Sequence, residues 1–211
     1  MNIMKKLISF CLLFSILLIS CEKKEIAAGS SPPFSTPGSK LPLFQIETNT
    51  GIENEPKVPG YLKIYDGQAL VFEHNIGIEY RGSTSFRLSD KKSYGFETWD
   101  EGGEDINTSI LGYPEEEDWI LTGHVFRAST NTIFDPTLMR HFVGYELYRA
   151  MGNYASRCKF VELAVNGDFL GTYVFMEKLK RDKNRIDIKK LNSDEKINCF
   201  LPALFNTIDK L

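Results

Sequence analysis

The sequence predicts an α+β domain in which antiparallel strands joined by tight turns accompany one main helix. Residues 43–48 alternate roughly between apolar and polar side chains, which is the period of a half-buried strand. Asp66-Gly67 and Asn166-Gly167 are short turn signals typical of β-hairpins. After Asp135-Pro136, apolar residues recur at the spacing of one helix face.

The N-terminal segment is predicted to be a targeting signal that lies outside the domain. Residues 7–19 form an apolar run that is shorter than the ~20 residues of a membrane span and fits the centre of a signal peptide. The run ends at Ser20-Cys21, which is similar to a bacterial lipobox. That similarity implies a signal peptide over residues 1–20, cleavage before Cys21 and acylation of its thiol, with palmitate among the expected chains. An ordinary signal peptide or an anchor helix with a coincidental cysteine is the alternative.

Residues 21–42 are rich in glycine, serine and proline. Such a segment cannot bury enough apolar surface to offset its ordering entropy, so we expect the lipidated cysteine to be followed by a flexible tether. The sequence therefore predicts an extracytoplasmic lipoprotein of the cell envelope or surface, anchored to a membrane through its lipid. Whether that membrane is the inner or the outer one stays open.

The composition is that of an ordinary folded domain. The net charge is −3 and 12% of the residues are aromatic, which is enough for a core. The domain has no basic block of the kind that binds nucleic acid, so we expect no nucleic-acid partner. Cys158 and Cys199 are the cysteines left to form a disulfide, and no cysteine and histidine cluster indicates a zinc site. His74, His124 and His141 are scattered and are interpreted as surface or core residues.

The first half of the domain is predicted to consist of short strands. The acidic residues 100–107 and the three consecutive glutamates 115–117 are interpreted as solvated loops, the latter in preference to a metal site. Gly82-Ser83-Thr84-Ser85 breaks the strand pattern. The predicted strands are residues 61–65, 69–73, 77–81, 91–99 and 119–121.

The clearest helix begins with Asp135 as N-cap and Pro136 at the first helical position and runs to about residue 151. Glu146 falls within its apolar stripe. A carboxylate buried there without a partner would be costly, so we expect a cation or donor to reach it; Arg140 and Arg149 lie to the sides. The stripe comprises Met139, Phe142, Val143, Leu147 and Ala150.

Two more strands, residues 160–165 and 172–176, follow the helix, and then a charged stretch over 178–185 is interpreted as a solvated loop before a last short strand at 186–188. The order of these elements is that of a protein-kinase small lobe. It runs from strands through a glycine and serine break, lysines on a strand, a helix with an acid and a hairpin to a charged exit. In that lobe a strand lysine contacts the nucleotide phosphates and pairs with a helix glutamate. The pattern alone leaves this as one candidate among several α+β folds.

Specific segments resemble the CotH kinase family over about residues 78–190. The resemblance implies an atypical secretory protein kinase that uses ATP and a divalent metal, Mg or Mn, to phosphorylate serines of secreted or surface proteins. Its protein substrate stays unknown. The similar segments are residues 78–85, 91–94, 111–119, 135–140, 145–147, 160–163, 166–167, 171–173, 176–178 and 181–188.

The resemblance also implies a nucleotide site. Arg81, Gly82, Ser83 and Ser85 would form the loop near the phosphates, where a glycine permits close approach of the backbone.

Lys91 or Lys92 would contact the phosphates, and only one of them can face the site if both lie on a strand. Glu146 would hold that lysine, and Met176 and Glu177 would lie near the adenine. For each of these residues an ordinary structural role is the alternative.

A kinase also needs acidic metal ligands and a catalytic carboxylate, which in the family lie beyond residue 188. Residues 192–211 do not resemble the segment expected there. We therefore identify residues 43–191 with the N-terminal portion of the family, identify no catalytic residue, and expect a truncated chain that is inactive alone. A non-catalytic module for surface binding or adhesion is the alternative.

Overall fold

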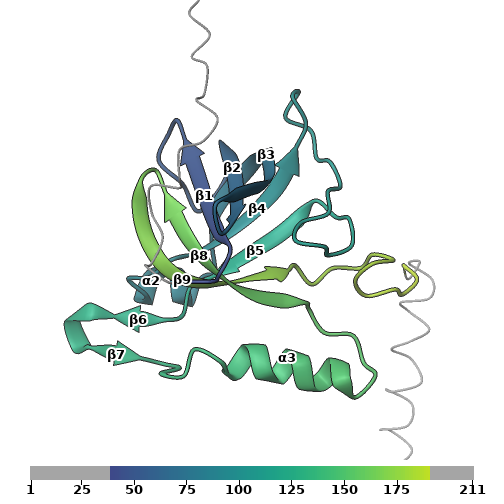
Figure 1. Ribbon diagram of the computed structural model, residues 1–211. Coiled ribbons are helices and arrows are strands. Elements are labelled where there is room, and N and C mark those ends of the chain that lie inside the picture. The colour runs from purple at the N-terminus through teal and green to yellow at the C-terminus, as the bar shows by residue number, and fades with distance from the viewer. Residues whose placement is uncertain (1–38, 191–211) are drawn as a thin grey trace, which may run out of the picture. The chain divides into compact units, whose positions relative to one another are not determined.

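In the computed structural model, residues 39–190 are described and seven of their strands close into a barrel (Figure 1). The strands follow one another around the barrel in the order β1-β2-β3-β4-β5-β9-β8, and all neighbours are antiparallel except β1 and β8, which close the barrel in parallel. The strands are β1 (Leu43–Thr48), β2 (Val58–Asp66), β3 (Ala69–Arg81), β4 (Ser93–Trp99), β5 (Asp118–Thr122), β8 (Cys158–Val165) and β9 (Asp168–Glu177).

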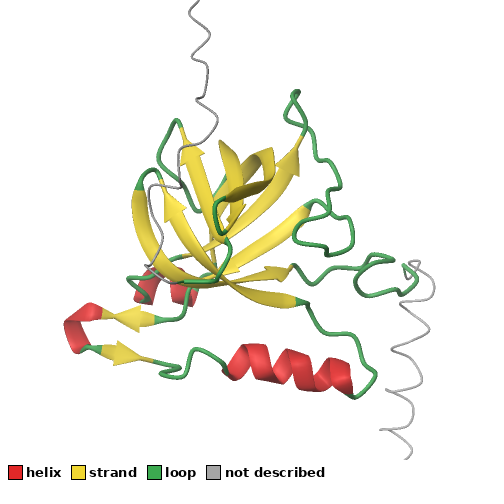
Figure 2. Ribbon diagram, viewed as in Figure 1, coloured by secondary structure: helices red, strands yellow, loops and turns green. Residues whose placement is uncertain are grey.

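The remaining elements are short, apart from one helix (Figure 2). The short helix α2 (Thr84–Leu88) lies in the connection from β3 to β4. Between β5 and β8 the chain forms a two-stranded ribbon and then the main helix α3. The elements of this crossover are β6 (Phe126–Arg127), the 3₁₀ turn η1 (Ala128–Thr130), β7 (Thr132–Ile133) and α3 (Arg140–Ala150).

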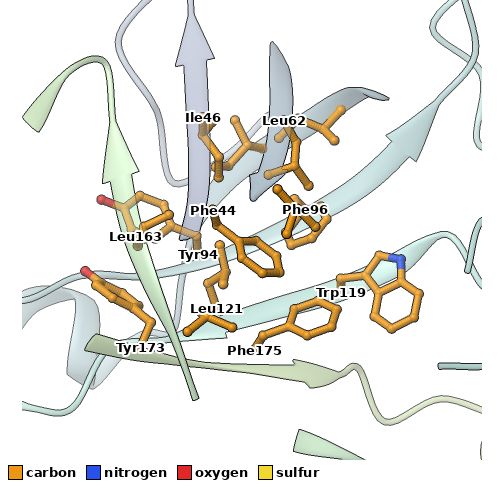
Figure 3. Close-up of a cluster of buried hydrophobic side chains, with 14 of the residues drawn as sticks. Phe44, Ile46, Leu62, Tyr94, Phe96, Trp119, Leu121, Leu163, Tyr173 and Phe175 are labelled. Carbon is orange, nitrogen blue, oxygen red and sulfur yellow. The ribbon is translucent and has the colours of Figure 1, made fainter. Parts of the chain in front are cut away.

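Aromatic side chains fill the barrel (Figure 3). Phe175 of β9 is at its centre, with ring centroids 5.0 Å from Phe44, 5.2 Å from Trp119 and 5.6 Å from Tyr113. Phe44, Trp119 and Phe175 reach the centre from strands distant in sequence because alternate side chains of each strand point inward, and Tyr113 reaches it from the loop before β5. The core therefore holds together β1, β5 and β9, and the outer faces of β5 and β9 form the site described below.

Most predicted strands are confirmed, and both hairpin turns lie where their glycines indicated. Three corrections concern the strand of the first hairpin, the lysine pair and the last predicted strand. Residues 69–81 form one continuous strand rather than two. Lys91 and Lys92 precede β4 in a bend, so the alternation of a strand does not govern where their side chains point. The predicted strand at 186–188 is reduced to an isolated bridge between Arg181 and Ile186.

The main helix is confirmed, but its predicted beginning is wrong. It starts at Arg140 rather than at Pro136, because Leu138 has a φ of 57°, which no right-handed helix accepts. Asp135 still organises the approach to the helix: its Oδ2 accepts a hydrogen bond of 2.9 Å from the backbone N–H of Arg140, and its Oδ1 accepts one of 2.6 Å from the hydroxyl of Thr137.

Antiparallel strands with one main helix are therefore confirmed, whereas closure into a barrel was not predicted. Closure requires β1 to pair with β8 across more than a hundred residues of sequence, and no local pattern encodes such a pairing. Within residues 39–190, no helix has the length and apolar character needed to cross a bilayer. The proposed lipidation site Cys21, Cys199 and residues 192–211 lie outside the described residues. The possible disulfide between Cys158 and Cys199 is therefore untested, and Cys158 is buried.

Candidate functional site

A pocket of about 170 Å³ lies between helix α3 and the outer face of strands β5 and β9. Its floor is apolar and its rim carries cationic or protonatable side chains. The lining residues are Arg81, Ile120, Thr122, His124, His141, Phe142, Tyr145, Val174, Met176 and Leu179.

The floor is a second, smaller apolar cluster outside the barrel. Ile120 of β5 packs there with Val174 and Met176 of β9, all of them buried. Phe142 of α3 covers the cluster and stacks on Phe160 of β8 with ring centroids 4.9 Å apart. The helix is thus attached to the sheet by aromatic packing, and the floor is a flat apolar surface between the two.

Histidine and arginine side chains form the rim. Arg81 reaches the pocket from the end of β3, and His141 from the first turn of α3. His124 donates through Nε2 to the carbonyl of Leu138 at 2.9 Å, which leaves its buried Nδ1 without a partner among the described residues. Burial lowers the pKa of His124 below its ordinary value. The neutral ring therefore presents an unpaired acceptor inside the molecule.

The two candidate lysines have separate and different environments. The ammonium of Lys91 donates to the carbonyl of Thr172 at 2.6 Å and lies 4.4 Å from the centre of the Tyr173 ring. Burial lowers its pKa. The ammonium of Lys92 donates to the carbonyls of Phe86 and Ser89 at 2.6 and 2.8 Å, so it holds the C-terminal end of α2. Neither lysine lines the pocket.

The predicted phosphate loop borders a separate open hollow of about 550 Å³, which Arg81, Gly82 and Ser83 help to line. Gly82 has a φ of 98°, and a β-carbon on it would lie 2.3 Å from the Oγ of Ser85. Only glycine fits this position without displacing the loop. Arg81 lies between this hollow and the pocket beneath α3, because it lines both.

Glu146 does not pair with either lysine. Its carboxylate accepts a hydrogen bond from Arg149, one helical turn onward, and 43% of the Glu146 side chain is exposed. The expectation that Glu146 is buried in the apolar stripe is therefore wrong, although the expected partner at Arg149 is confirmed. The stripe itself is largely exposed, since Met139, Val143 and Leu147 are about half open to solvent.

Met176 and Glu177 point to opposite sides of β9. Met176 lines the pocket, whereas the carboxylate of Glu177 is fully buried away from it. It accepts hydrogen bonds from Arg185 at 2.7 Å, from Arg157 at 2.5 Å and from the hydroxyl of Tyr154 at 3.2 Å. Glu177 therefore fastens the exit of β9 to the barrel.

The charged exit is a loop, but it is solvated only in part, at exposed residues such as Arg181 and Lys183. Arg185 is buried, and its guanidinium lies 4.9 Å from the ring centre of Trp119. Lys180 contacts the carboxylates of Glu116, Glu117 and Asp118 together at 2.5–2.9 Å. The glutamate run and the basic exit, both interpreted as solvated, therefore neutralise each other in part through Lys180.

The same contacts test whether this acidic group suits a divalent metal. Carboxylate oxygens of Glu116, Glu117 and Asp118 lie within 4.8 Å of one another. However, the ammonium of Lys180 occupies the position where they converge, and Lys178 binds Asp118 at 2.6 Å. None of the three acids lines the pocket beneath α3. The group does not fit a metal that would act on a nucleotide there.

Sequence reasoning placed Arg81 and Met176 at what proves to be the pocket but missed most of its lining. Thr122 and His124 follow a short buried strand without any motif, and His141 was interpreted as an ordinary surface or core residue. Phe142 was assigned to the apolar stripe of the helix, and that periodicity was the available signal for a face packed on the sheet.

The profile of the family described as CotH kinase protein matches residues 78–200. The match covers more than half of the chain and includes β4, β5, α3, β8, β9 and the pocket between them. The chain therefore belongs to the CotH kinase family. No curated protein matches it in sequence.

Proposed function

We propose that this chain binds ATP beneath helix α3 as the nucleotide-holding part of a CotH-type protein serine kinase. The observation that carries the proposal is the pocket's combination of an apolar floor with an arginine, Arg81, at its rim. Floors of this kind suit planar rings, and a few convergent polar groups then fix the orientation of the ligand. Adenine has such a ring, and the phosphates of ATP require cations.

The adenine would lie on Ile120, Val174 and Met176, with Phe142 above it. The phosphates would extend toward Arg81 and the Gly82–Ser85 loop, because Arg81 joins the two hollows. An arginine suits this position since its guanidinium binds phosphate oxygens in pairs. Lys91 does not line the pocket, and its charge acts on the site through the neighbouring ring of His124.

This arrangement also supports likeness to a kinase small lobe. The glycine loop joins β3 to β4, α3 precedes the β8–β9 hairpin, and β9 leaves the pocket through Met176 and Leu179. It departs from that lobe in two respects: the strands close into a seven-stranded barrel, and among residues 39–190 no lysine pairs with the helix glutamate.

Phosphoryl transfer would need acids that hold a metal near the phosphates. The described residues offer one convergent acidic group, Glu116, Glu117 and Asp118, and lysines neutralise it. ATP binding is therefore the function that this site supports, and transfer to serines of a secreted or surface protein is proposed from the family alone. The lipid anchor at Cys21 and an extracytoplasmic location belong to the same proposal.

Thermal unfolding with and without ATP and Mg or Mn tests the proposal. A ligand at about 100 times its Kd stabilises by about 2.7 kcal/mol, which raises the melting temperature of a chain of this size by about 5–11 °C. Arg81→Ala should abolish most of that rise, whereas Arg127→Ala, an exposed arginine of β6 outside both hollows, should retain it.

No rise with ATP, or equal rises in both variants, would refute nucleotide binding at this pocket. The chain would then be better described as a non-catalytic surface binding module. AMP separates the contributions further, because it keeps the adenine but carries fewer phosphates. It should give a smaller rise that depends less on Arg81.

A further inference from the structure

An aligned row of side chains crosses the outer face of β2, β3 and β4, away from the nucleotide pocket. Tyr61 pairs with Asn75, and Asn75 pairs with Trp99, so the three lie side by side across the strands. Their sequence neighbours Leu62 and Ile76 are fully buried in the barrel. Since alternate residues face opposite sides of a strand, the row faces outward.

Trp99 lies across this face rather than standing out from it. A β-carbon on Gly77 would lie 1.9–2.4 Å from three atoms of the Trp99 indole, so the ring occupies the space that a side chain on β3 would fill. One face of the indole therefore rests on the backbone of Gly77. The chain has two tryptophans, and the other, Trp119, is fully buried in the core.

Hollows lie on both sides of the indole. One, of about 350 Å³, is bounded by Tyr61, His74, Asn75, Asp100, Glu101 and Ile106 in addition to Trp99. The other, of about 740 Å³, is lined by Glu55, Pro56, Lys57, Glu79 and Glu97 as well as Trp99. Together they form a shallow depression with an aromatic centre.

The wall of the smaller hollow is fixed in place. Asp100 Oδ1 accepts hydrogen bonds from the backbone N–H groups of Gly102 and Glu104 at 2.8 and 3.0 Å. The loop closes further through a hydrogen bond of 2.8 Å from the Asp100 N–H to the Glu104 carbonyl. The carboxylate of Asp100 is therefore held at the edge of the aromatic centre.

We propose that this depression binds a neutral oligosaccharide. A pyranose ring offers an apolar face of C–H groups that packs on Trp99 and Tyr61, and aromatic side chains supply such contact area at low entropic cost. Its hydroxyls donate to the carboxylates of Asp100 and Glu101, which only accept. The Asn75 amide both donates and accepts.

The charge of the depression selects among ligands. In the larger hollow, Lys57 already pairs with Glu79 and Glu97. The acids of the wall, Asp100 and Glu101, therefore carry the selectivity and repel anionic polysaccharides and nucleic acid. The site is independent of the nucleotide pocket, and Tyr61 and Asn75 lie outside the part of the chain that matches the family profile.

Titration of the full chain with cellohexaose, chitohexaose and, as an anionic probe, polygalacturonate tests the inference. Tryptophan emission should change saturably with at least one neutral hexasaccharide and not with polygalacturonate, since Trp99 is the tryptophan at the surface. By calorimetry, Trp99→Ala should weaken binding by about tenfold or more, as expected for a central aromatic anchor. Tyr148→Ala, an exposed tyrosine of α3, should leave the affinity unchanged.

Two further variants guard against a folding defect in Trp99→Ala. Tyr61→Ala removes the second ring, and Asn75→Ala removes the amide between the rings while leaving Trp99 in place. Each should weaken binding severalfold without altering the unfolding transition. Failure of both neutral hexasaccharides to bind overturns the inference. Binding that survives all three substitutions, or tighter binding of polylysine than of either sugar, also overturns it, the latter in favour of a site for cationic peptides.

Discussion

The buried carboxylate of Glu177 should be among the most sensitive positions for stability. The substitution Glu177→Met removes the partner of Arg185, whose side chain is completely buried. Breaking a buried ion pair from one side costs about 3–5 kcal/mol, because the remaining charge is left without compensation. Arg157 adds less to this cost, because 36% of its side chain is exposed and water can solvate its charge.

The reverse substitution should cost less, and the structure explains the asymmetry. After Arg185→Met, Glu177 still accepts hydrogen bonds from the side chain of Arg157, from its backbone N–H at 2.8 Å and from Tyr154. We expect a loss of about 1–3 kcal/mol, typical of a lost charged hydrogen bond. In the double variant no buried charge is left without a partner, so adding Arg185→Met should recover part of the stability lost in Glu177→Met.

Urea unfolding followed by tryptophan fluorescence, to which the buried Trp119 contributes, measures all four chains of this cycle. With a slope of about 2 kcal/mol/M, Glu177→Met should lower the midpoint by about 1.5–2.5 M. The matched control is Glu146→Gln, whose carboxylate is half exposed. The reasoning is refuted if Glu177→Met costs less than about 1 kcal/mol, or if the two single losses simply add.

Three further outcomes follow from the site. Burial lowers the pKa of His124 in the folded chain. Stability that the neutral ring provides above the ordinary pKa of 6.5 is therefore lost as the pH falls through the lower folded value. Between about pH 7.5 and 5.5 the urea midpoint should fall more in the native chain than in His124→Gln, and equal slopes would contradict this. Gly82→Ala should cost about 1–3 kcal/mol in urea unfolding, because the added β-carbon meets Ser85 Oγ in a backbone conformation of positive φ. It should also reduce the ATP-induced rise in melting temperature. An unchanged rise would show that the loop does not contact the nucleotide. Glu146→Gln should change stability by no more than about 0.5 kcal/mol, since its pair with Arg149 is partly exposed. It should also leave the ATP-induced rise in melting temperature intact. Loss of that rise would show that Glu146 takes part in nucleotide binding.

Local features of the sequence predicted local structure well. The turn dipeptides Asp66-Gly67 and Asn166-Gly167 fix hairpins because glycine adopts positive φ there, and both hairpins form as expected. The apolar spacing after Asp135 indicated the helix, and the positive φ of Leu138 is what shortened it. These signals act within a few residues, which is why a single sequence reveals them.

Charged segments were misread for a related reason. The glutamate run and the basic exit each look solvated by themselves, because long runs of charge normally face water. They lie about sixty residues apart and neutralise each other only after β5 and β9 have paired. A composition-based interpretation sees each run alone and assigns both to solvent.

The same pairing explains why the pocket lining could be named only in part. Met176 reaches the pocket because β9 lies beside β5, with Met176 opposite Ile120 in the ladder. Glu177 is one residue further and therefore faces the other side, where Arg185 and Trp119 enclose it. The exit from β9 thus has an apolar side on the pocket beneath α3 and an ionic side attached to the barrel. A change in the ionic side is consequently expected to displace Met176, and Glu177→Met should weaken ATP binding although it touches no ligand.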